Sequence, residues 1–174
     1  SEEEEADKAI RTIAKAIEDL VRDLERALKE SKRNIEELAK DLKRANDRIE
    51  EELEKANVPE ETLRELRKRS EDSNREIEKA LRELTKAHED IEREIRRTLE
   101  ELRRRLKELR EEARKTRVDK ELADRLRDLL RDAKRVVDRI KRALEELNKE
   151  AKKLVERAKK KHDDLLEDVK RDTK

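Results

Sequence analysis

Residues 57–61 read Asn-Val-Pro-Glu-Glu, and this stretch holds the only proline of the 174-residue chain. Proline is favoured at the first position of a helix, because its missing N–H group would have no partner there. Glu60 and Glu61 follow in the first turn, where the helix dipole favours acidic side chains. Asn57 tolerates the left-handed conformation that often ends a helix. The stretch therefore predicts that one helix ends and another begins here.

A second boundary is indicated by the stretch Thr-Arg-Val-Asp at residues 116–119. Asp119 is a favourable N-cap residue, and Val118 before it can pack onto the first turn of the next helix. Ser1 and Glu4 have the spacing of a capping box at the start of the chain. No glycine interrupts the remaining sequence. We therefore predict three helices, at about residues 2–56, 59–115 and 119–172.

The lengths and spacings of these helices predict their arrangement. Each helix of about 55 residues would be about 80 Å long, and short connections make neighbouring helices antiparallel. Leucines recur every 18 residues at Leu129, Leu147 and Leu165, which is the period of an undistorted helix. The third helix also has adjacent apolar pairs, as a helix that faces two partners requires. The sequence predicts an all-α fold: one antiparallel three-helix bundle domain over residues 1–174, with very long, nearly straight helices.

The composition limits the classes of function. Charged residues make up 58% of the chain, but 51 basic groups nearly balance 50 acidic groups. Near-neutral charge and periodic apolar residues favour long helices over disorder. No apolar run approaches the roughly 18 residues of a membrane span, and the acidic start lacks the basic region of a signal peptide. We expect a soluble chain with no membrane partner and no targeting signal, such as a recombinant product expressed in a cytoplasm.

The densest basic run is Arg103–Arg105, which is the strongest candidate for contact with nucleic acid. Such an interface usually combines a basic surface with aromatic side chains that stack on bases. The chain has no aromatic residue, and glutamates are interleaved throughout. We therefore interpret the run as a solvated face and expect no nucleic-acid partner.

Polar residues interrupt the apolar stripes at positions that correspond between helices. Two residues on neighbouring helices are called level when they lie at the same height along the bundle. Because neighbouring helices are antiparallel, the numbers of level residues should add up to about 116 across the first connection and to about 234 across the second. Ser70 would then lie level with Asn46 and within one turn of His162. This count predicts a first polar layer of Asn46, Ser70, Ser73, Asn74 and His162. It predicts a second polar layer of Ser31, Thr85, His88 and Asn148.

Buried polar groups need hydrogen-bond partners, and a half-satisfied network is worse than an apolar core. We therefore predict that Asn46 and His162 bond to serine or asparagine of the first layer, and that His88 bonds to Ser31 or Asn148. Such layers penalise slipped helix registers, as one buried asparagine does in coiled coils. Buried neutral histidines would also have pKa values below the usual value of about 6.5. Stability would then decline in acid.

The histidines do not predict an active site. A serine hydrolase needs a nucleophile, a base, an orienting acid and oxyanion donors around a cleft, and long helices without glycine offer no such cleft. Di-metal helical bundles use Glu-x-x-His, but Thr85 and Lys159 occupy the positions three residues before His88 and His162. We expect no enzyme activity, no cofactor and no metal site, and we interpret both polar layers as structural.

Taken together, these features resemble de novo designed helical bundles with buried hydrogen-bond networks. The resemblance rests on the glycine-free helices, the Pro-Glu-Glu start at residue 59, the Glu/Lys/Arg surface and the Ser/Asn/His layers in a Leu/Ile core. It implies a structural scaffold that has no natural activity and requires no partner. An interaction module is the alternative: a heterodimer or switch component that accepts a partner helix in the groove beside the third helix. Self-association remains open as well.

Overall fold

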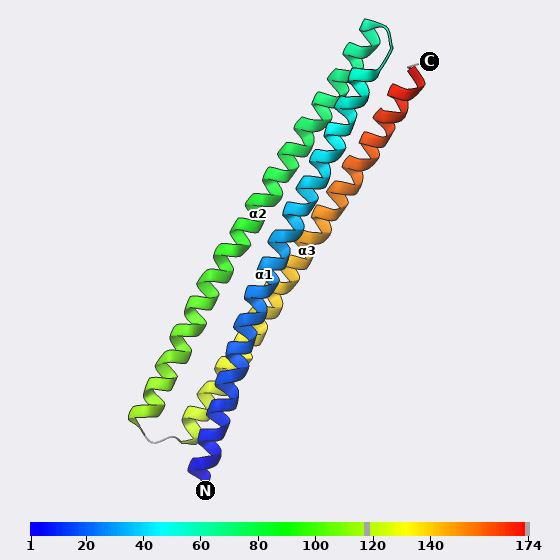
Figure 1. The fold of residues 1–174 in the computed structure, drawn as a ribbon. Coiled ribbons are helices and arrows are strands. Elements are labelled where there is room, and N and C mark those ends of the chain that lie inside the picture. The colour runs from blue at the N-terminus through cyan, green and yellow to red at the C-terminus, as the bar shows by residue number, and fades with distance from the viewer. Residues whose placement is uncertain (117–118, 173–174) are drawn as a thin grey trace. The chain divides into compact units, whose positions relative to one another are not determined.

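The computed structural model describes residues 1–116 and 119–172, apart from the side chains of Glu2 and Glu3. Three α-helices follow one another: α1 (Glu2–Lys55), α2 (Glu60–Lys115) and α3 (Lys120–Asp172) (Figure 1). The described residues contain no β-strand. The predicted all-α, three-helix architecture is confirmed, and each helix end lies within one residue of the predicted position.

Side-chain caps define the starts of two helices. Asp119 Oδ1 accepts a hydrogen bond of 3.0 Å from the backbone N–H of Leu122. Ser1 Oγ accepts one of 3.3 Å from the N–H of Glu4. These bonds satisfy N–H groups that have no partner within the helix. The predicted N-cap roles are confirmed, whereas the predicted packing of Val118 lies outside the described residues.

The end of α1 differs from the expected glycine-like cap. No described residue has a positive φ, so Asn57 does not adopt the left-handed conformation. Instead, the N–H of Ala56 donates to the carbonyl of Leu53 at 3.3 Å and tightens the last turn. The carbonyl of Pro59 accepts the first bond of α2 from the N–H of Leu63 at 3.0 Å. Residues 56–59 form the connection between the two helices.

Replacing Asp119 with alanine should lower the free energy of unfolding by about 1 kcal/mol, because the N–H of Leu122 loses its acceptor. Asp119→Asn keeps an acceptor oxygen at the same place and serves as the matched control. Urea denaturation followed by circular dichroism measures both variants. Equal losses in the two variants would show that charge near the helix dipole, and not the cap bond, stabilises this end.

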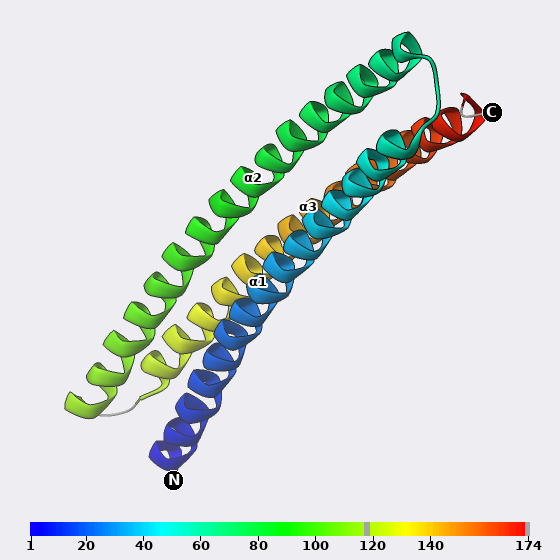
Figure 2. The same cartoon turned by 45° about the horizontal axis from the view of Figure 1, so that its top comes forward.

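The chain divides into two compact units, and each contains a segment of all three helices. Unit 1 consists of Ser1–Glu30 and Glu89–Glu145, and unit 2 consists of Ser31–His88 and Glu146–Lys174. Within each unit, the segment of α2 runs opposite to the segments of α1 and α3 (Figure 2). The single domain over residues 1–174 and the straightness of the helices remain predictions.

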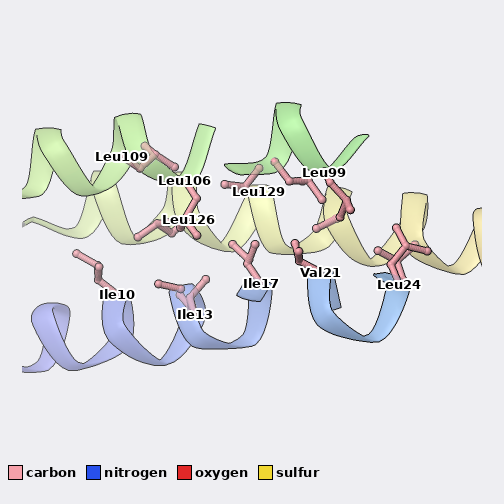
Figure 3. Packing of buried hydrophobic residues seen from close by; sticks show 14 of the residues in the cluster. Ile10, Ile13, Ile17, Val21, Leu24, Leu99, Leu106, Leu109, Leu126 and Leu129 are labelled. Carbon is pink, nitrogen blue, oxygen red and sulfur yellow. The ribbon is translucent and has the colours of Figure 1, made fainter. Parts of the chain in front are cut away.

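Unit 1 has one continuous apolar core, named the Leu129 cluster after one of its fully enclosed members. Figure 3 shows Ile13 and Ile17 of α1 directed towards Leu126 and Leu129 of α3. Leucines of α2, including Leu106, close the third side (Figure 3). Among the described residues, nineteen buried apolar side chains belong to this cluster. Burial of so many apolar side chains from three helices makes hydrophobic packing the main source of stability in unit 1.

Ion pairs between α2 and α3 give the register of unit 1. Arg125 Nη1 lies 2.8 Å from Glu112 Oε2, and Arg105 Nη2 lies 3.9 Å from Asp132 Oδ2. The residue numbers of both pairs add up to 237. This value lies within one helical turn of the predicted 234 and shows that the two segments are antiparallel. The predicted α2–α3 register is therefore confirmed in unit 1.

The register between α1 and α2 differs from the prediction. In unit 1, Arg110 Nη2 lies 2.7 Å from Glu18 Oε1, and Arg103 bonds to Glu25. The numbers of both pairs add up to 128. The prediction of about 116, which assumed a tight turn near residues 57–59, is wrong. The count from a tight turn therefore fails for this pair of helices.

Unit 2 has a divided core. The Leu66 cluster contains Ile49, Leu53, Leu66, Leu165 and Val169. The Leu42 cluster contains Leu42, Val155 and Ala158, with Leu38, Ile77 and Leu81 packed against it. The residues of the first predicted polar layer lie between these two clusters in sequence, on all three helices: Asn46, Ser70, Ser73, Asn74 and His162. The residues of the second predicted layer instead lie beyond the Leu42 cluster.

Candidate functional site

All nine residues of the two predicted polar layers lie in unit 2. The side chains fall into three classes of burial. The buried residues are Ser31, Ser70, His88 and His162. The half-buried residues are Asn46, Ser73, Asn74 and Asn148, and Thr85 is exposed. Eight of the nine polar residues are thus at least partly enclosed.

The second polar layer contains a hydrogen bond between α1 and α3. Ser31, which is 2% exposed, donates through Oγ to Asn148 Oδ1 at 3.3 Å. The two residues are 117 positions apart, close to the offset of 118 that the level count predicts for these parallel helices. His88 is also buried. Its bond to Ser31 or Asn148 remains a prediction, but the meeting of Ser31 and Asn148 is observed.

Thr85 does not belong to the buried part of this layer, so its prediction is wrong. Its neighbour Leu84 is half-buried and His88 is buried, which places the inward face of α2 at these two positions. A residue adjacent to Leu84 is rotated by about 100° around a helix of 3.6 residues per turn. Thr85 therefore points towards solvent although it has the correct height.

Two ion pairs fix the register of α2 and α3 in unit 2. Arg69 Nη1 lies 2.9 Å from Asp168 Oδ2, and Lys161 Nζ lies 2.8 Å from Glu76 Oε2. Their residue numbers again add up to 237, which sets His162 level with position 75 of α2. Ser31 and Asn148 are 117 positions apart, and the same offset sets His162 level with position 45 of α1. Four predicted residues thus form one level, the His162 layer: Asn46, Ser73, Asn74 and His162.

Ser70 precedes Ser73 and Asn74 by about one turn of α2. Ser70 is buried and lines a recess together with Asn74 and with Leu53 of α1, and the numbers of Ser70 and Leu53 add up to 123 rather than 116. The shift arises because residues 56–59 continue beyond the end of α1 before α2 turns back (Figures 1 and 2). Four extended residues span at most about 14 Å, which equals the rise of about nine helical residues.

The His162 layer does not contain the hydrogen bonds that were predicted for it. Asn46 Oδ1, Ser73 Oγ and both ring nitrogens of His162 are buried and have no hydrogen-bond partner among the described residues. The serine hydroxyl is attached directly to Cβ and reaches less far into a core than a leucine side chain does. The four residues share a level, but their short polar groups do not bridge the space between helices.

The environment of His162 favours the neutral imidazole. Burial lowers the pKa of His162 below its usual value of 6.5, and the carboxylate of the adjacent Asp163 opposes this effect only in part. At the rim, a hydrogen bond from Lys161 lowers the pKa of the exposed Glu76. Such exposed pairs contribute little to stability because water screens them. The significant electrostatic feature is therefore the buried imidazole.

The basic run Arg103–Arg105 is paired with acids. Arg103 bonds to Glu25, Arg105 lies 3.9 Å from Asp132, and Arg104 contacts both Glu101 and Glu108. The Glu101 carboxylate raises the pKa of Arg104 further. These ion pairs engage the run within unit 1. They agree with its interpretation as a solvated face.

The described residues were compared with the requirements of metal sites and membrane spans, and the chain was compared with known proteins. Across residues 1–116 and 119–172, no three histidine, cysteine, aspartate or glutamate side chains gather as ligands of a metal ion would. Within the same residues, no helix is long and apolar enough to cross a membrane. No protein-family model, curated protein or solved structure matches this chain.

Proposed function

We propose that this protein is a designed structural scaffold without enzymatic activity, in which polar core residues specify how the helices align. The observation that carries this proposal is the hydrogen bond from Ser31 Oγ to Asn148 Oδ1. It joins residues 117 positions apart on two helices within a buried layer. A slip of either helix by one turn would separate these groups and place an unpaired polar atom against apolar side chains, which is costly.

The composition of the surface supports the same proposal. No large apolar side chain is exposed among the described residues. Ion pairs cross between helices at the rims of both units, as in Glu94–Arg139 and Glu76–Lys161. Each such pair adds only tenths of a kcal/mol, but opposite charges in register favour the correct alignment. A scaffold with this surface needs no partner to cover it.

The experiment compares the parent chain with Ser31→Val combined with Asn148→Leu. Size-exclusion chromatography with light scattering should give the mass of one chain for the parent. The variant should remain helical but populate additional oligomers, because an apolar layer no longer penalises wrong pairings. Thr85→Val, at an exposed position nearby, serves as the control and should behave as the parent does. A parent that self-associates, or a variant as monodisperse as the parent, would contradict the proposal.

A helix-binding module is the second candidate, and one observation favours it. A groove of about 710 Å³ lies between α2 and α3 in unit 1. Thr98, Leu102 and Val136 contribute to its lining, and Val136 belongs to the wide apolar stripe of α3. The groove would be the docking place for a partner helix. The charged rim and the lack of exposed large apolar side chains in the described part favour the scaffold over this module.

The two candidates differ in how they respond to a charge in the groove. If the module reading holds, the parent binds an environment-sensitive apolar dye, and Val136→Glu abolishes that signal. If the scaffold reading holds, the parent gives no dye signal, and the substitution changes only stability. Lys134→Glu, on the exposed face of α3, controls for the added negative charge.

A further inference from the structure

The His162 layer combines burial with unsatisfied polar groups from three helices. His162 is 4% exposed, and neither Nδ1 nor Nε2 has a hydrogen-bond partner within the described chain. Asn46 Oδ1 on α1 and Ser73 Oγ on α2, at the same level, are also buried and have no hydrogen-bond partner within the described chain. Each unsatisfied buried group favours any state in which water reaches it.

The apolar core on either side of this layer is small. The Leu66 cluster contributes five buried residues and the Leu42 cluster three, counted over the described residues. The Leu129 cluster of unit 1 contains nineteen, counted in the same way. Regions with fewer buried apolar contacts open locally at lower free energy than regions with many. The least satisfied polar layer thus lies in the unit with the smaller clusters.

A proton on the imidazole would be poorly accommodated in this layer. A neutral imidazole has one nitrogen lone pair, and protonation there makes a cation that donates from both nitrogens. The other members of the His162 layer are neutral, so none supplies a carboxylate. An unpaired buried cation is unfavourable because it loses its hydration. Opening of the layer would return the cation to water.

Charged groups surround the layer on every helix but lie at its rim. All are exposed except the half-buried Asp41, and acids accompany the bases on each helix. Of these groups, only Asp163 opposes the effect of burial on the pKa of His162. The charged residues within one turn of the level are Asp41, Lys43, Arg44, Asp47 and Arg48 on α1, Glu71, Asp72, Arg75, Glu76, Glu78 and Lys79 on α2, and Lys159, Lys160, Lys161, Asp163 and Asp164 on α3.

We propose that mild acid opens unit 2 by protonation of His162, while unit 1 stays folded. The sign follows from proton binding. Because the pKa of His162 is lower in the folded chain than the usual 6.5, the open state binds more protons as the pH falls. Stability of unit 2 is therefore full above pH 6.5 and is lost as the pH falls from there through the folded-state pKa. The chain would carry one acid-sensitive unit and one acid-resistant unit.

Hydrogen exchange at pH 7.5 and pH 5.0, expressed as protection factors, tests the proposal on the full chain. Amides of unit 2 should lose protection, by more the lower the folded-state pKa of His162 lies and by at most about 30-fold at pH 5.0 for an open-state pKa of about 6.5. Amides of unit 1 should keep their protection. Equal losses in both units would overturn the proposal, because they would indicate general loss of carboxylate pairs.

Two variants and one titration assign the effect to a residue. His162→Asn should make the protection of unit 2 insensitive to pH over this range, whereas His88→Asn should leave the acid response in place. A response removed by the His88 variant and kept by the His162 variant would refute the assignment. If His162→Asn fails to fold, nuclear magnetic resonance titration of the parent decides. A midpoint for His162 below 6.5 supports the proposal, and one at or above 6.5 overturns it.

Discussion

Leu129→Ala should lower the free energy of unfolding of unit 1 by about 2–5 kcal/mol, the range for truncating a buried leucine. Leu129 is 0% exposed and lies at the centre of the Leu129 cluster (Figure 3). Truncation removes three carbon atoms of apolar contact and leaves a cavity that rigid neighbouring helices fill only in part. Guanidinium denaturation with hydrogen exchange of residues 89–116 measures the change.

Leu130→Ala is the matched control, because it removes the same atoms one position along α3. Leu130 is half-buried at the edge of the cluster. Its truncation removes less buried surface and leaves a space open to water, so the loss should be about 1 kcal/mol. Similar losses for Leu129 and Leu130 would mean that α3 in solution does not present the face described here.

Filling the His162 layer with apolar side chains should stabilise unit 2 by about 3 kcal/mol or more, since each unsatisfied buried polar group is worth about 1–3 kcal/mol. The variant combines Asn46→Leu, Ser73→Ala and His162→Leu. It removes buried atoms that have no partner among the described residues. It also joins the Leu66 and Leu42 clusters into one core. The midpoint of urea unfolding, followed through protection of amides in unit 2, measures the gain.

The control replaces a satisfied pair by the substitutions Ser31→Val and Asn148→Leu. Removing both partners of a hydrogen bond together is nearly neutral, so stability should change by less than about 1 kcal/mol. If the triple variant is less stable than the parent, the polar groups of the His162 layer are satisfied in solution. Sedimentation velocity of the triple variant would also show whether register is lost as stability is gained, as expected when polar specificity is removed.

The helix ends could be predicted from sequence because their signals are local. Pro59, through its ring, and Asp119, through its carboxylate, act on the backbone within a few residues, so the three helices were placed to within one residue. The α2–α3 register also followed, because the connection between Lys115 and Lys120 is short. In both cases, the determining groups lie close together in the chain.

The α1–α2 register could not be predicted in the same way. It depends on the direction in which residues 56–59 leave α1, and no residue type in that segment encodes the direction. A change of a few dihedral angles there moves α2 by more than a turn. This movement brings Ser70 beside Leu53.

The hydrogen bonds of the polar layers were the least predictable part. Helical spacing gave the height of His162 and Asn46 within unit 2. A hydrogen bond, however, requires the donor and acceptor to approach to about 3 Å with the donated hydrogen directed at the acceptor. That condition depends on side-chain rotamers and on the separation of helices. Ser31 and Asn148 approach to 3.3 Å, whereas Ser73 and His162 form no such bond within the described chain.

The composition of the two units has a consequence for synthesis of the chain on a ribosome. Every segment of unit 1 has been translated once Glu145 is added, whereas unit 2 still lacks the part of α3 that begins at Glu146. Domains tend to fold as units during translation once their segments are available. Residues 31–88 must therefore wait until residues 146–174 have been translated before their core can close. During that interval, their leucines and isoleucines would be the natural target for a chaperone.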